Sequence, residues 1–173
     1  MQRSKPVILR LTRIVLRVMV VLNTVTGVLI FALLVASLLA ESQVPVMLGA
    51  RAAAGPALIQ GIRLMMVIGI AGVPLAYILL KRLLAIVDTV RAGDPFVMQN
   101  AERLQTIAWA LLGLELLHLA AGAVAAVASS EADPLDIDWS FSVTGWLAVL
   151  LLFVLARVFD HGARMRGDLE GTI

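Results

Sequence analysis

The sequence contains no cysteine among its 173 residues, which excludes disulfides, thiolate catalysis, Cys-ligated zinc and iron–sulfur clusters. Charged residues are also scarce, at 15% of the chain, whereas a typical soluble domain has about 25%. Hydrophobic residues make up 61%, and the mean hydropathy is +0.97. A single core of this length cannot bury so much apolar surface, so we expect an integral membrane protein. The net charge of +2 gives no indication of direct nucleic-acid binding.

Four apolar stretches are long enough to cross a bilayer: 18–40, about 62–82, 104–128 and about 143–159. A helix needs about 20 mostly apolar residues to cross about 30 Å of hydrocarbon. The runs lack the alternation of barrel strands, so helices are favoured. The sequence therefore predicts an all-α polytopic membrane protein with four transmembrane helices in a single domain over residues 1–173. The first apolar run is longer than that of a cleaved signal peptide, so we expect it to stay attached.

Positive charge is distributed unevenly between the ends of these crossings. Twelve of the 14 Lys and Arg lie before the first crossing, in the middle loop or after the last crossing, and only Arg51 and Arg63 lie on the other side. The positive-inside rule then places both termini and the middle loop in the cytoplasm. We expect a multi-pass protein of the bacterial inner membrane, with membrane lipid around it.

Two ionisable residues lie near the middle of the third crossing. Glu115 and His118 are three apart and therefore share a helical face. Charge at that depth is costly unless it is paired or hydrated. One interpretation is a proton-titrating pair, and the other is a polar clasp in which Glu115 bonds His118 or a polar residue of the first crossing, Asn23, Thr24 or Thr26.

Small and helix-weakening residues mark the second and third crossings. Gly69, Gly72 and Pro74 favour a kinked, tightly packed helix over an unwound binding segment. The third crossing ends in a run of Gly and Ala over 120–126, which predicts a close helix contact within or between subunits.

No motif in the sequence supports catalysis. Glu-x-x-His occurs once, whereas a di-iron bundle needs it twice with two further Glu residues. The acidic loop 133–138 lacks the spacing and the Gly of a calcium loop. We therefore expect a protein that is not an enzyme, with no catalytic residue, no metal site and no cofactor.

Two cytoplasmic segments have a defined pattern. In the middle loop, Gly93 suits a left-handed helix end, and Asp94 or Asn100 is suited to cap the next helix. After the last crossing, the spacing predicts a helix that leaves the membrane with an apolar stripe of Val158, Phe159, Met165 and Leu169. We expect this stripe to pack against the middle loop or against a partner.

These segments resemble the signatures of a bacterial family of small four-helix membrane proteins with a domain of unknown function. The resemblance is carried by Gly-Asp-Pro-Phe-Val at 93–97 with Asn100, Arg103 and Leu104, and by Phe159, Gly162, Ala163 and Asp-Leu-Glu-Gly-Thr-Ile at 168–173. Arg157 departs from the acidic residue expected there, and Glu115 and His118 match no signature. Members are often encoded beside a helix-turn-helix regulator of the Xre type, which implies that the pair acts together.

Three functional hypotheses follow. The first is a non-enzymatic membrane protein that binds a partner, such as a small DNA-binding regulator, through its cytoplasmic turn and tail. The candidate contact residues are Asp94, Pro95, Phe96, Asn100, Arg103, Phe159, Gly162, Asp168 and Glu170. Turn and tail alternatively pack only on each other, with Arg103 paired to Asp168 or Glu170. The second hypothesis is an accessory subunit of a larger membrane complex, and the third is a small proton-coupled transporter or channel that uses Glu115 and His118 in a homo-oligomer.

Overall fold

The computed structural model describes residues 5–39, 56–93, 95–128 and 142–170. Its four helices are α1 (Lys5–Leu39), α3 (Pro56–Arg91), α4 (Met98–Ala128) and α5 (Val143–Glu170). The described part of the chain is therefore all-α. Each of the four helices is long and apolar enough to span a membrane.

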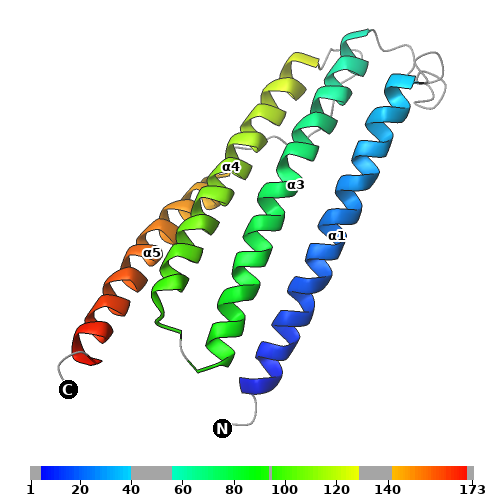
Figure 1. Ribbon diagram of the computed structural model, residues 1–173. Helices are drawn as coiled ribbons and strands as arrows, with labels where there is room; N and C mark the ends of the chain where they lie inside the picture. The colour runs from blue at the N-terminus through cyan, green and yellow to red at the C-terminus, as the bar shows by residue number, and fades with distance from the viewer. Residues whose placement is uncertain (1–4, 40–55, 94, 129–141, 171–173) are drawn as a thin grey trace.

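The helices form an open row in chain order (Figure 1). α1 packs on α3, α3 packs on α4, and α4 packs on α5, while the other pairs of described helices make marginal contact or none. α4 is the central element, and its first half contributes most of its buried residues: Asn100, Ala101, Leu104, Ile107, Ala108 and Ala110. Only one side of α1 is covered by protein, and its large apolar side chains are mostly exposed. In a membrane that surface is solvated by lipid, so the fold is that of a multi-pass membrane protein.

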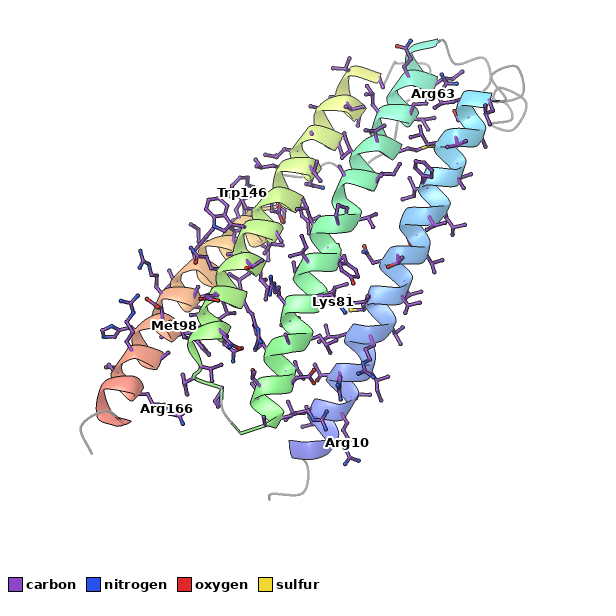
Figure 2. The ribbon with its side chains drawn as sticks, viewed as in Figure 1. Arg10, Arg63, Lys81, Met98, Trp146 and Arg166 are labelled. Atoms are coloured by element: carbon purple, nitrogen blue, oxygen red, sulfur yellow. The ribbon has the colours of Figure 1, made fainter. Side chains whose placement is uncertain are left out.

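The helices extend well beyond the apolar runs, mainly on the side of the apolar region where the turn between α3 and α4 lies. α1 has 35 residues and α3 has 36, which at about 1.5 Å per residue gives over 50 Å, against about 30 Å of hydrocarbon. The extensions are the start of α1, the end of α3, the start of α4 and the end of α5. Both described chain ends and the turn between α3 and α4 lie at this end (Figure 1). Figure 2 shows Arg10 and Arg166 there and Arg63 at the opposite end.

Glycine allows close approach where the helices cross within the apolar region. A Cβ added at Gly61 of α3 would overlap the Cβ of Ala128 of α4. A Cβ added at Gly27 of α1 would lie 2.9 Å from both methyl groups of Val73. The small residues Gly122 and Ala125 of α4 are buried. The close contact expected for the end of the third crossing thus forms within the chain, between α4 and α3.

α3 is a continuous helix through Pro74, as expected for a packed rather than an unwound segment. The carbonyl of Val73, just before this proline, accepts a hydrogen bond of 3.0 Å from Asn23 Nδ2 of α1. Pro74 removes the amide donor to the carbonyl of Ile70, four residues earlier, so the bond from Asn23 to Val73 is an additional contact and not a replacement. Asn23 therefore fastens α1 to α3 at the proline.

Arg63, one of the two basic residues on the less basic side, has a structural role. Its Nε donates to Ser37 Oγ at 3.0 Å, and its Nη2 donates to the Ser37 carbonyl at 2.6 Å. Ser37 lies in the last turn of α1, whose carbonyls lack helical partners and carry partial negative charge. Arg63 thus caps α1 from α3.

Candidate functional site

The turn between α3 and α4 is built on one glycine. α3 ends at Arg91, and Gly93 has a φ of 90°, in the left-handed region that glycine enters without strain. The amide of Ala92 donates to the carbonyl of Asp88 at 3.1 Å, and the amide of Gly93 donates to that of Val90 at 3.2 Å. The expected role of Gly93 as a helix terminator is confirmed. Asp94 lies outside the described residues.

Asn100 is the buried centre of this turn. It is completely inaccessible, and it lies inside α4, which begins at Met98. Its Nδ2 donates to the Pro95 carbonyl at 2.9 Å and to Thr89 Oγ1 at 2.8 Å. The expectation that Asn100 caps the helix is wrong: its side chain ties the turn to the end of α3 instead.

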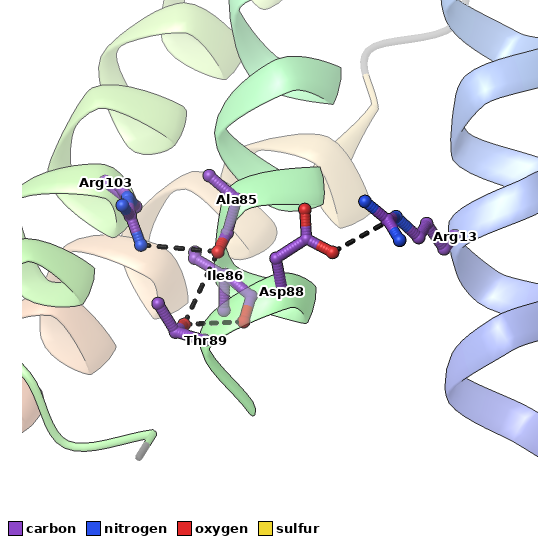
Figure 3. A network of polar contacts seen from close by, with 6 residues as sticks. All are labelled: Arg13, Ala85, Ile86, Asp88, Thr89 and Arg103. Carbon is purple, nitrogen blue, oxygen red and sulfur yellow. Dashed lines mark hydrogen bonds and ion pairs between the residues drawn. The ribbon is translucent and has the colours of Figure 1, made fainter. Parts of the chain in front are cut away.

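Arg103 completes the network from the next turn of α4. Its Nη1 donates to Asn100 Oδ1 at 2.8 Å and to the Ala85 carbonyl of α3 at 3.3 Å. Thr89 donates its own hydroxyl hydrogen within α3, to the Ile86 carbonyl at 2.7 Å. Figure 3 shows the side chains of Arg103 and Thr89 directed at the same carbonyl of α3, that of Ala85. All three polar side chains are therefore satisfied within the chain, as buried polar groups must be.

The same end of α3 is also joined to α1. Arg13 Nε lies 3.2 Å from Asp88 Oδ1, in an ion pair whose side chains are partly exposed. Asp88 points away from Arg103 and towards α1 (Figure 3). The end of α3 thus connects to both of its neighbours through polar groups. Sequence reasoning missed this pair because no local pattern links a residue of the first helix to one at the end of the second.

The turn and the last helix pack directly on each other. The rings of Phe96 and Phe159 stack with their centroids 5.3 Å apart and their planes at 29°. Gly162, one turn further along α5, lies under Phe96: a Cβ there would be 3.8 Å from Phe96 Cδ1. Phe96 still exposes 48% of its surface. The two segments that carry the family resemblance therefore form one continuous surface, which we call the Phe96–Phe159 surface, made of Pro95, Phe96, Phe159 and Gly162.

The last turns of α5, beyond the apolar region, agree with the predicted helix but only in part with its predicted apolar stripe. The helix runs to Glu170, as the spacing predicts. Of the expected apolar stripe, Phe159 packs on Phe96, but Val158 and Met165 are exposed by 58% and 53%. The side chains of Leu169, Asp168 and Glu170 lie outside the described residues, so the pairing of Arg103 with the tail stays a prediction.

Glu115 and His118 do not form the pair that their spacing suggests. The Glu115 carboxylate lies against Gly145 of α5, where an added Cβ would overlap it. His118 is exposed on α4, and no hydrogen bond joins the two described side chains. The clasp to the first crossing is wrong as well: Asn23 bonds Val73, and Thr24 donates to the Val20 carbonyl of its own helix at 2.9 Å. The reason is topological, because α1 packs on α3 and Glu115 faces α5.

Two grooves flank the first turns of α4. The larger, of about 600 Å³, lies between α4 and α5 and is lined by Met98, Ala101, Glu102, Gln105, Phe153, Ala156, Arg157, Asp160 and Arg164. The smaller, of about 330 Å³, is lined by Arg82 of α3 with Gln99, Glu102, Arg103 and Thr106. Neither groove contains Glu115 or His118. Within the described residues, no cluster of three or more His, Asp or Glu is arranged to hold a metal ion, and the acidic loop 133–138 lies outside them.

The fold defines the class as a multi-pass membrane protein with an ordered polar turn beyond one end of its apolar region. Residues 39–173 match the family described as "Protein of unknown function (DUF2975)", so the chain belongs to that family. The match covers α3, α4 and α5 and reaches only the last residue of α1. Comparison with curated proteins and with solved structures finds no match.

Proposed function

We propose that this chain is a non-enzymatic protein of the bacterial inner membrane that binds a protein partner on its cytoplasmic Phe96–Phe159 surface. The observation that carries the proposal is the stacking of Phe96 on Phe159, which leaves Phe96 about half exposed. Large, partly exposed aromatic side chains held by rigid neighbours are typical anchors of protein interfaces. The buried Asn100 network holds this surface in place.

The surface has the chemistry of a small binding site. Phe96 lies on a turn held by hydrogen bonds to Asn100 and by the left-handed Gly93, so its backbone is preorganised. Asn100 itself is fully buried and acts as a positioning residue rather than as a contact residue. Asp94, Asp168 and Glu170 remain candidates for acidic contacts with the partner. The partner that the family resemblance implies is a small DNA-binding regulator of the Xre type, kept at the membrane or released from it.

The orientation can be tested because the natural chain has no cysteine. Gln99 is exposed beside the turn, and Gln60 is exposed at the opposite end of the row. In intact cells we expect a membrane-impermeant maleimide to label Gln60→Cys and to label Gln99→Cys only after permeabilisation. Labelling in the reverse order would place the Phe96–Phe159 surface outside and would contradict the proposal.

Partner binding is tested by capturing the tagged protein from native membranes in mild detergent and identifying bound proteins by mass spectrometry. We expect a stoichiometric helix-turn-helix protein with the wild type, and its loss with Phe96→Ala or Asp94→Asn. The matched control is Met98→Ala, because Met98 is 42% exposed close to Phe96 but lines the groove beside α5. Undiminished capture by Phe96→Ala, or a loss of membrane abundance equal to the loss of capture, would refute a binding role.

One observation favours a second candidate, an accessory subunit of a larger membrane complex. Among the described helices, α1 packs closely on α3 alone, and it exposes apolar side chains such as Leu22 and Leu29 by 58% each. A helix of a larger assembly would fit against this face by packing in the membrane. Migration of the solubilised protein with a large complex, unaffected by Phe96→Ala, would support this candidate over the first.

A further inference from the structure

The groove between α4 and α5 combines charge of both signs with an apolar wall. Each side of the groove is formed by one face of a helix. The residues of α4 are Met98, Glu102 and Gln105, and those of α5 are Phe153, Arg157, Asp160 and Arg164. Phe153 and Met98 supply apolar surface, and the other side chains supply polar groups. A ligand that fills this groove must itself be amphipathic.

Two of the four charged residues of the groove have no partner among the residues that the structure describes. Asp160 and Arg164 form an ion pair of 3.2 Å along α5. Glu102 and Arg157, from opposite sides of the groove, make neither an ion pair nor a side-chain hydrogen bond with any residue that the structure describes. The groove therefore presents one free carboxylate and one free guanidinium.

The groove lies where α5 leaves its apolar region. No charged residue occurs in α5 between Val143 and Ala156, and Arg157 is the first. From Phe153 to Arg157 the helix rises about 6 Å, which matches one headgroup layer of a bilayer about 40–45 Å thick with about 30 Å of hydrocarbon. If Phe153 is level with the first acyl carbons, Arg157 is level with the headgroups, Asp160 lies just outside them and Arg164 lies in water. The placement of these residues depends only on their distance from the hydrocarbon edge, and it is the same whichever leaflet is cytoplasmic.

We propose that this groove is a binding site for the headgroup of a zwitterionic phospholipid with a primary amine, of the phosphatidylethanolamine class. Such a headgroup carries one phosphate anion and one ammonium, which matches the free Arg157 and the free Glu102. Arg157 donates to the phosphate oxygens, since a guanidinium forms paired hydrogen bonds with phosphate. Glu102 accepts from the ammonium, with Asp160 beside it, and an acyl chain runs along Phe153. The site is independent of the partner role proposed above.

The test measures lipid binding to the delipidated full-length protein by native mass spectrometry. Three phospholipids with identical acyl chains are compared: phosphatidylethanolamine, phosphatidylcholine and phosphatidylglycerol. We expect phosphatidylethanolamine to bind more than about tenfold more tightly than the other two, which is the size of difference that one charge-assisted hydrogen bond supplies. Phosphatidylcholine has no N–H to offer Glu102, and phosphatidylglycerol has no ammonium. This ranking needs no variant and so does not depend on any variant folding.

Two substitutions separate the two halves of the headgroup. Glu102→Gln should abolish the preference for the primary amine while phosphatidylglycerol binding is kept or increased. Arg157→Gln should weaken the binding of phosphatidylethanolamine and of phosphatidylglycerol alike, by about tenfold. The matched control is Arg10→Gln, which removes an exposed positive charge from α1 at the same end of the helices, outside both grooves, and should change neither result.

Three outcomes overturn the proposal. Equal binding of the three lipids by the wild type would show that the groove does not select a headgroup. A preference for phosphatidylglycerol, insensitive to Glu102→Gln, would assign the groove to anionic lipid. An equal loss of binding in Arg10→Gln and Arg157→Gln would show that the overall positive charge at this end, and not the groove, attracts the lipid.

Discussion

The fully buried Asn100 should be the most sensitive position in the turn. Asn100→Ala removes three hydrogen bonds at once, to the Pro95 carbonyl, to Thr89 and from Arg103. Each bond between neutral groups contributes about 1 kcal/mol net, and the bond to the guanidinium contributes about 1.5–3 kcal/mol. Asn100 is 0% exposed, so water does not replace its side chain without local opening. We therefore expect a loss of about 3–5 kcal/mol in the free energy of unfolding.

The assay is unfolding in mixed micelles with an increasing mole fraction of sodium dodecyl sulfate, followed by tryptophan fluorescence. Trp109 of α4 makes an edge-to-face contact with Phe153 of α5, with centroids 5.2 Å apart, so its emission reports the separation of these helices. Thr89→Val removes one acceptor of Asn100 and should cost about 1 kcal/mol. In the double variant that same bond is lost only once, so the two effects should fall short of additivity by about 1 kcal/mol.

The control is Gln99→Ala, the exposed neighbour whose contact with Arg103 is long, at 3.4 Å. We expect it to cost less than about 0.5 kcal/mol, as surface substitutions usually do. If Asn100→Ala costs no more than Gln99→Ala, the hydrogen bonds of Asn100 do not stabilise the turn, and the reasoning from burial fails.

Two further predictions concern contacts between neighbouring helices, measured by the same unfolding assay. Asp88→Asn should cost at most about 1 kcal/mol, because the ion pair with Arg13 is partly exposed, and exchanging the two charges between positions should restore most of the loss. Gly61→Ala should cost about 1–3 kcal/mol, because the new methyl overlaps the Cβ of Ala128, which cannot rotate away. Gly69→Ala, whose methyl would make an ordinary contact, should be neutral within about 0.5 kcal/mol; equal effects at both glycines would contradict the close approach.

Hydropathy predicted the four helices because lipid imposes a simple rule on length and apolarity. The turn at Gly93 was also predictable, since only its own backbone conformation is involved. The helices continue beyond the predicted crossings: α1 begins at Lys5, ahead of the crossing predicted from residue 18, and α3 continues to Arg91. Outside the hydrocarbon, hydropathy no longer reports whether a polar segment is helical, and contacts such as Arg13 with Asp88 decide it.

The sequence was sufficient to identify the segments that form the site, but not to predict what each side chain in them contacts. The sequence placed Asn100 at a helix start, where an asparagine usually caps, and its burial depends on Thr89 and Arg103 reaching the same point from two helices. Glu115 could not be assigned a partner because the sequence does not state which helices are neighbours. Once α4 is known to lie between α3 and α5, its contact with Gly145 follows.

Different interactions hold the helices together within the apolar region and beyond it, near the turn between α3 and α4. Within the apolar region lipid is as apolar as the side chains, so the helices associate by close packing, as at Gly27 on Val73. Beyond that region polar bonds take over, through Asp88, Asn100 and Arg103. Within the Phe96–Phe159 surface, Phe96 is held by these polar bonds and by its stacking on Phe159 of α5. Asn100→Ala is therefore expected to disturb the position of Phe96 more than the packing of the helices within the apolar region.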